Sequence, residues 1–163
     1  MKLVLLFALF LSTAATAQEC KLIKETDPYT KETLLSTGFI FVTGGSVTVD
    51  ANSKEIDVLF SIAGADKCYD NNSTAVIYFE GSKVKTTLRN GGTMNCEGLF
   101  HFIFKNTAST TAVLKKITTQ KITHIVFTGN NKKETTLSIS PQQQDALVLL
   151  ANCLVTDAKS LIK

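Results

Sequence analysis

The feature that most constrains the fold is a two-residue alternation of side chains through the middle of the chain. Ile56, Val58, Phe60 and Ile62 occupy every second position of the stretch 55–63. An extended strand points successive side chains to opposite faces of a sheet. This period therefore predicts a β-strand with one face in a hydrophobic core.

The same pattern predicts a strand-rich domain on both sides of this stretch. Residues 80–82 read as the turn of a hairpin, because Gly81 can take the positive φ of a tight turn. Gly44 and Gly45 interrupt a stretch that is expected to be buried, residues 37–43. Further strands are predicted at 21–25, 37–43, 46–50, 74–79, 83–88, 98–105, 121–128 and 134–139.

Two helices are predicted near the end of the chain. Residues 110–119 place apolar side chains at helical intervals. Ser140, Pro141 and Gln143 form a helix start, with a capping serine, a proline at the first position and a capping-box glutamine. An apolar stripe follows, at Leu147, Leu150, Ala151, Leu154, Ala158 and Leu161. The order predicts an α+β fold, a mainly antiparallel domain with a short helix and a C-terminal amphipathic helix packed on the sheet.

The first 17 residues have the layout of a signal peptide. Lys2 supplies the positive charge, residues 3–11 are apolar, and residues 15–17 form an Ala-x-Ala cleavage site. The apolar run is too short for a spanning helix, which needs about 20 residues. We expect residues 18–163 to form a single globular domain, secreted or periplasmic, with no transmembrane span after signal removal.

Four cysteines lie beyond the signal, which suggests two disulfides in an exported protein. Three pairings are possible, and we favour Cys20 with Cys153 and Cys68 with Cys96. The first pair would tie the first strand to the last helix, and the second would staple the base of the central hairpin. Zinc is the alternative, but no C-x-x-C pair exists and the two histidines lie far from metal-ligand spacing.

No catalytic constellation stands out, and no cofactor motif is present. His101 and His124 lie inside predicted strands, without a neighbouring nucleophile signal. The loop 66–72 carries carboxylates and amides that could hold calcium, although it departs from the EF-hand spacing and turn formation explains the same residues. The net charge of +3 is too small to indicate a nucleic-acid partner.

Three phenylalanines on one face of the stretch 98–105 are weak candidates for ligand binding. Phe100, Phe102 and Phe104 could line an apolar pocket if the sheet curls into a barrel. An aromatic stripe of this kind also suits a plain core.

Residues 95–100, 121–125 and 144–154 together resemble small bacterial secreted proteins that have no assigned activity. This resemblance implies a periplasmic or secreted setting and structural cysteines, and it supplies no site residues. The expected function is therefore an exported, non-enzymatic domain that binds a partner, such as an envelope or extracellular protein, or acts structurally. The alternatives are a small-ligand carrier and a hydrolase that uses scattered acids or His101.

Overall fold

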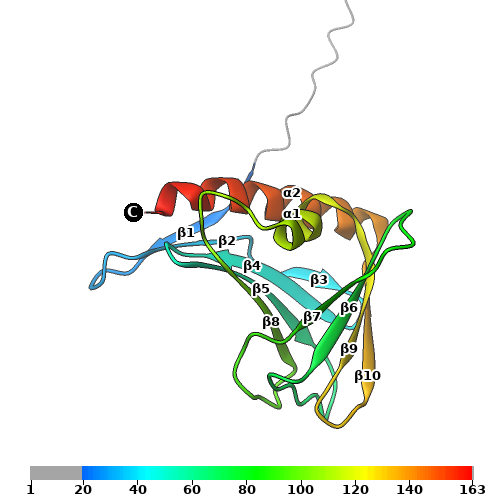
Figure 1. Cartoon of the computed structure of the whole chain (residues 1–163). Helices are drawn as coiled ribbons and strands as arrows, with labels where there is room; N and C mark the ends of the chain where they lie inside the picture. Colours follow the sequence, from blue (N-terminus) through cyan, green and yellow to red (C-terminus); the bar gives the residue numbers. More distant parts are fainter. Residues whose placement is uncertain (1–19, 163) are drawn as a thin grey trace, which may run out of the picture.

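The computed structural model describes residues 20–162, and the predicted signal peptide lies outside them. Within this range the chain forms two antiparallel sheets, with helices gathered on one side (Figure 1). The α+β class predicted from the alternation is confirmed.

Sheet A contains six strands and forms the larger part of the fold. β4 (Gly45–Ala51) pairs with β5 (Glu55–Ile62) along seven residues, and β5 pairs with β8 (Leu99–Lys105) along another seven. The short strand β3 (Ile40–Val42) pairs with β4 outside the main order. That order is β1 (Ile23–Thr26), β2 (Thr33–Ser36), β4 (Gly45–Ala51), β5 (Glu55–Ile62) and β8 (Leu99–Lys105).

Sheet B contains four strands, in the order β10 (Glu134–Ser138), β9 (Ile122–Thr128), β6 (Thr74–Phe79) and β7 (Thr86–Arg89). Two short links connect it to sheet A. The backbones of Thr43 and Ser138 exchange hydrogen bonds of 3.2 and 3.3 Å, and the Gly91 N–H donates to the His101 carbonyl at 2.8 Å. The strands remain two sheets and do not close into a barrel.

The space between the two sheets is filled by aromatic rings. Phe100 lies 5.0 Å from Phe127 of sheet B, 5.2 Å from Tyr69 and 5.4 Å from Phe102, measured between ring centroids. Phe60 joins the cluster at 5.4 Å from both Phe102 and Phe127. These contacts explain how alternate residues of β5, β8 and β9 hold the two sheets together.

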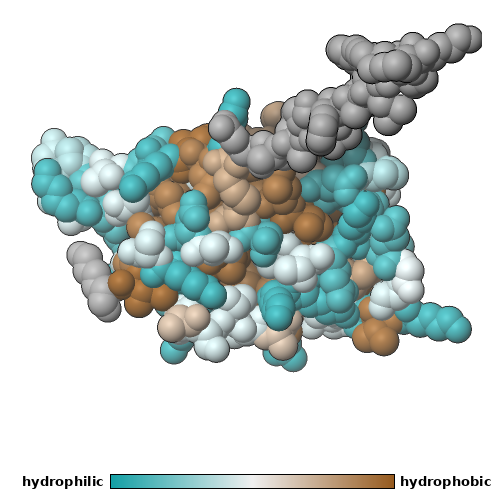
Figure 2. Space-filling model, turned by 90° about the horizontal axis from the view of Figure 1, so that it is seen from above, coloured by the Kyte–Doolittle hydropathy of each residue, from teal (hydrophilic) through white to brown (hydrophobic). Residues whose placement is uncertain are grey.

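The long helix α2 (Pro141–Ala158) crosses the top of the fold in Figure 1, with α1 (Ala112–Thr119) against it and the 3₁₀ turn η1 (Lys159–Leu161) after it. The predicted capping box is present, with Ser140 accepting from the Gln143 N–H and the Gln143 side chain accepting from the Ser140 N–H. Leu147 and Leu154 face the core. Hydrophobic residues also gather on the outward side of this layer (Figure 2). Leu149 and Leu150 of α2 are half-buried.

The two disulfides join Cys20 to Cys153 and Cys68 to Cys96, the two pairs favoured from the sequence. Cys153 lies on α2, and Cys20 comes three residues before β1. The first disulfide therefore fastens the start of sheet A to the helix layer. Disulfides of this kind are typical of oxidising, extracytoplasmic compartments.

No helix in residues 20–162 has the length and hydropathy of a membrane span.

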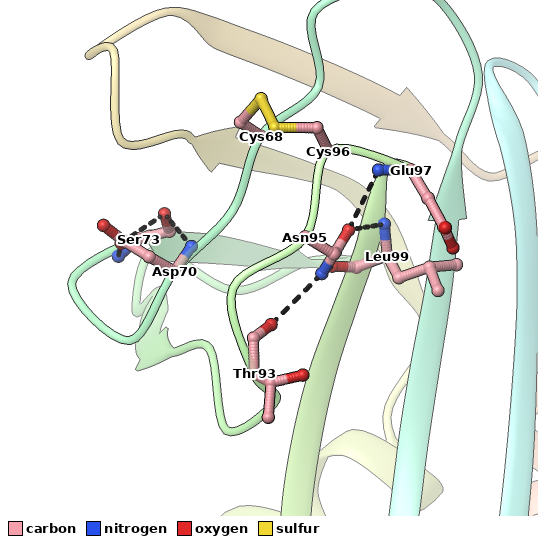
Figure 3. Close-up of a disulfide and its surroundings, with 8 residues drawn as sticks. All are labelled: Cys68, Asp70, Ser73, Thr93, Asn95, Cys96, Glu97 and Leu99. Atoms are coloured by element: carbon pink, nitrogen blue, oxygen red, sulfur yellow. Dashed lines mark hydrogen bonds between the residues drawn. A yellow bond between two sulfur atoms is a disulfide. The ribbon is translucent and has the colours of Figure 1, made fainter.

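Cys68 and Cys96 lie beside a backbone bridge in which Tyr69 and Asn95 exchange hydrogen bonds of 2.8 and 3.0 Å. The Asn95 side chain organises the turn that follows (Figure 3). Its amide donates to the carbonyls of Thr93 and Leu99, and its oxygen accepts from the Leu99 N–H at 3.0 Å. The second disulfide thus closes a loop that is already held by backbone and side-chain hydrogen bonds.

Four strand assignments need correction. The first strand covers Ile23–Thr26 and not 21–25, and the short strand β2 was missed. The strand predicted at 83–88 begins only at Thr86 and ends at Arg89. The stretch 37–43 is not one buried strand, because Gly38 adopts a φ of 68° and only Ile40–Val42 pairs with β4. Phe39 and Phe41 consequently point outward, and their side chains are 67% and 74% exposed.

Candidate functional site

The outer face of sheet A carries the strongest candidate site in the described structure. Residues that pair across antiparallel strands point to the same side of the sheet. One row of such pairs runs Ile23, Ser36, Asp50, Asp57 and Ile103 from β1 to β8. The next row runs Thr48, Leu59 and His101. Two carboxylates and a histidine therefore lie among apolar side chains on one surface.

A groove of about 370 Å³ opens on this face between β1, β2, β4 and β5. Its walls are apolar, and Ile23 and Phe39 are 50% and 67% exposed. Exposed side chains of this size on one concave surface mark binding sites more often than isolated ones do. The full lining is Ile23, Glu25, Leu34, Ser36, Gly38, Phe39, Thr48, Asp50 and Leu59.

Asp50 is the acidic group that β4 presents to this groove. Burial raises the pKa of Asp50 above its usual range, the Ser36 side chain acts in the opposite direction, and the charge of Asp57 raises the pKa further. The last effect follows from the register, because Asp50 and Asp57 are direct cross-strand partners. Like charges placed opposite each other destabilise a sheet.

Asp57 is engaged by His101, whose Nδ1 lies 2.7 Å from Asp57 Oδ2. Both side chains are about one-fifth exposed, at 23% for His101 and 22% for Asp57. The second carboxylate oxygen of Asp57 is buried and has no partner among the described atoms. A histidine–aspartate pair is two-thirds of a Ser–His–Asp triad. In residues 20–162, however, the hydrogen bond to Asp57 is the only one that the His101 ring makes.

A second hollow, of about 440 Å³, adjoins the groove. The two hollows share Glu25 and Leu34, so they adjoin along β1 and β2. Asp27 and Glu32 also line the second hollow. A larger hollow of about 630 Å³ lies between the β1–β2 turn and η1, and its lining mixes Lys31 and Lys54 with polar groups and with Leu161 and Ile162.

The ligand candidates from the sequence lie on the opposite face of the same strand. Phe100 and Phe102 are 0% and 2% exposed, and they pack into the aromatic core between the sheets. Phe104 is partly buried against the same core. The alternation that placed these rings inward is also what places His101 and Ile103 on the groove side.

The remaining candidates stay apart from the groove. His124 lies on β9 and stacks on Tyr78 of β6, with ring centroids 4.2 Å apart. In the loop 66–72, the Asp70 carboxylate accepts hydrogen bonds from the Ser73 hydroxyl at 3.0 Å and from the Asn72 and Ser73 N–H groups at 2.9 Å, and these hydrogen bonds lower its pKa. Within the described part of the chain, no group of three metal-ligating side chains forms.

Sequence reasoning missed the groove because its residues are spread over five segments. The alternation that predicts the core also predicts which residues of 46–50 and 55–63 point outward. It does not predict that Asp50, Asp57 and Leu59 are neighbours, because that depends on the register of the two strands.

Comparison with protein-family models, curated proteins and solved structures gives no match.

Proposed function

We propose that the protein is an exported, non-enzymatic binding protein whose binding surface is the groove on the outer face of sheet A. The two disulfides support an oxidising location, such as the periplasm or the medium. Binding here needs no movement of the core, because the groove lies on the side of sheet A that faces away from the aromatic cluster.

The observation that carries the proposal is the concentration of exposed apolar side chains in one concave surface. Ile23, Leu34 and Phe39 are 50%, 40% and 67% exposed, although they share a groove on a folded sheet. Removing such surface from water releases about 25 cal/mol per Å². A bound molecule would supply the cover that these side chains lack within the described chain.

The first test is an intact mass of the chain exported by its own cell, under gentle and then denaturing, non-reducing conditions. Under denaturing conditions we expect the mass of a chain that begins at Gln18, less four hydrogens relative to the fully reduced chain, as two disulfides require. Under gentle conditions we expect additional mass from a bound molecule. Absence of that mass would contradict the proposal.

A pair of variants with equal exposure locates the binding surface. Phe39 and Val84 are both 67% exposed, but Phe39 lines the groove and Val84 lies in the connection between β6 and β7. We expect Phe39→Ser to lose the additional mass and Val84→Ser to keep it. Retention by both variants would move the binding surface away from sheet A. Thermal unfolding of both proteins serves as the control for folding.

A further inference from the structure

We infer that the groove binds a small organic cation, an ammonium group carried on an apolar body, with Asp50 as its counterion. This inference rests on the proposed function, because it assigns a class of ligand to the same groove. Four observations support it: the sign of the charge along the groove, the setting of Asp50, the nature of the walls and the size of the depression.

The charge of the lining is acidic, although the whole chain carries a net charge of +3. Glu25 and Asp50 line the groove, and Asp27 and Glu32 line the hollow that continues it. Among the described residues that line these two hollows, none is lysine or arginine. A depression lined by one sign of charge attracts ligands of the opposite sign.

Asp50 is the acid that is best placed to contact a ligand within the groove. It is partly buried, and its cross-strand neighbours are Ser36 and Asp57. His101 is engaged with Asp57, and no ion pair reaches Asp50 in residues 20–162. A half-buried carboxylate without a cation is electrostatically unfavourable, as its raised pKa reflects. An ammonium ion would supply the missing charge through a charge-assisted hydrogen bond.

The walls around Asp50 suit an apolar body next to the ammonium group. Leu34 and Leu59 belong to the neighbouring strands β2 and β5, and Ile23 comes from β1. The Phe39 ring adds an aromatic face to the same groove, and aromatic faces attract cations. A neutral apolar molecule would use these walls and leave Asp50 unpaired.

The size of the groove favours a small molecule over a protein segment. Small-molecule sites in proteins have volumes of about 300–1,000 Å³. The groove alone, at about 370 Å³, falls near the lower end of that range. Ammonium compounds with one ring or a short alkyl chain are therefore the fitting class.

The test compares two probes with the same body, 2-phenylethylamine, which is cationic at pH 7, and 2-phenylethanol, which is neutral. Binding to the disulfide-intact chain is followed by NMR chemical-shift changes in labelled protein. We expect the amine to shift residues of β1, β2, β4 and β5, with an affinity about tenfold or more above that of the alcohol. Added salt should lower the affinity for the amine and leave the affinity for the alcohol unchanged.

Two isosteric variants complete the experiment. Asp50→Asn should lower the affinity for the amine about tenfold or more, whereas Asp157→Asn, on an exposed turn of α2, should leave it unchanged. Equal affinities for the amine and the alcohol would overturn the inference that the ligand is a cation, although the groove would remain a binding surface. Binding of neither probe, or binding of a lysine-containing peptide alone, would overturn the small-cation inference. The mass experiment with Phe39→Ser would then decide separately whether the proposed function stands.

Discussion

Alternate residues of β5 and β8 divide between two faces of sheet A that differ in what they contact. On the inner face, Phe60, Phe100 and Phe102 are at most 2% exposed and touch the rings of sheet B and one another. On the outer face, Asp57 and His101 pair at 2.7 Å beside an open groove. One set of strands thus stabilises the domain with every second residue and exposes the other residues on the opposite face.

The largest difference between the two faces should appear in stability. Phe100→Ala removes a ring that contacts three other aromatic rings, and we expect a loss of about 3–5 kcal/mol in the free energy of unfolding. Phe41→Ala, on the outer face with 74% exposure, should change it by about 0.5 kcal/mol or less. Urea unfolding of both variants measures the contrast. Similar losses of unfolding free energy in the two variants would contradict the idea that the inner face alone stabilises the domain.

The disulfides should separate stability from binding. The Cys20–Cys153 bridge spans 133 residues, and it fastens the chain just before β1, which supplies Ile23 and Glu25 to the groove. Replacing both cysteines with serine should lower the free energy of unfolding by about 2–4 kcal/mol and weaken binding of the amine probe.

The matched control for this disulfide is the Cys68–Cys96 pair, which spans 28 residues and lies away from the groove. Removing it should also destabilise the chain, by a smaller amount because the closed loop is shorter, and should leave probe binding intact. Thermal unfolding and NMR titration of the two double variants give both quantities. Equal loss of binding in the two proteins would show that the first disulfide has no special role at β1.

Much of the inner face could be predicted from the sequence, because burial leaves a local trace. The two-residue alternation at Ile56, Val58 and Phe60 marked the core strand, and Ser140 with Gln143 marked the start of α2. These signals depend only on neighbours along the chain. The α+β class followed from their order.

The outer face could not be predicted in the same way, because the groove depends on strand register. Asp50 and Asp57 become neighbours only through the pairing of β4 with β5, and Ser36 joins them only through β2. β2 has four residues and no clear alternation, so it was missed. A turn at Gly38 then directed Phe39 outward, where the sequence suggested a buried strand.

The smallest expected effect is also the most specific, because it opposes the usual direction of mutation. The pKa of Asp50 is raised in the folded chain, mainly by burial, so its ionised form is less favourable there than in the unfolded chain. Ionised Asp50 therefore lowers stability at neutral pH. Asp50→Asn should raise the free energy of unfolding at pH 7 by about 0.5–1 kcal/mol, in the range of a cross-strand pair.

The stability gained by Asp50→Asn should depend on pH. As the pH falls through the raised pKa of Asp50 towards its ordinary value of 3.8, the wild-type carboxyl takes up a proton and its penalty disappears. The advantage of Asp50→Asn should therefore be present at pH 7 and vanish below about pH 3.8. Urea unfolding of the wild-type protein and of this variant at a series of pH values measures the trend. Higher stability of Asp50→Asn at neutral pH, together with loss of amine binding, would identify Asp50 as a residue that contributes to binding and lowers stability. A loss of stability at pH 7 would instead make Asp50 a structural part of sheet A.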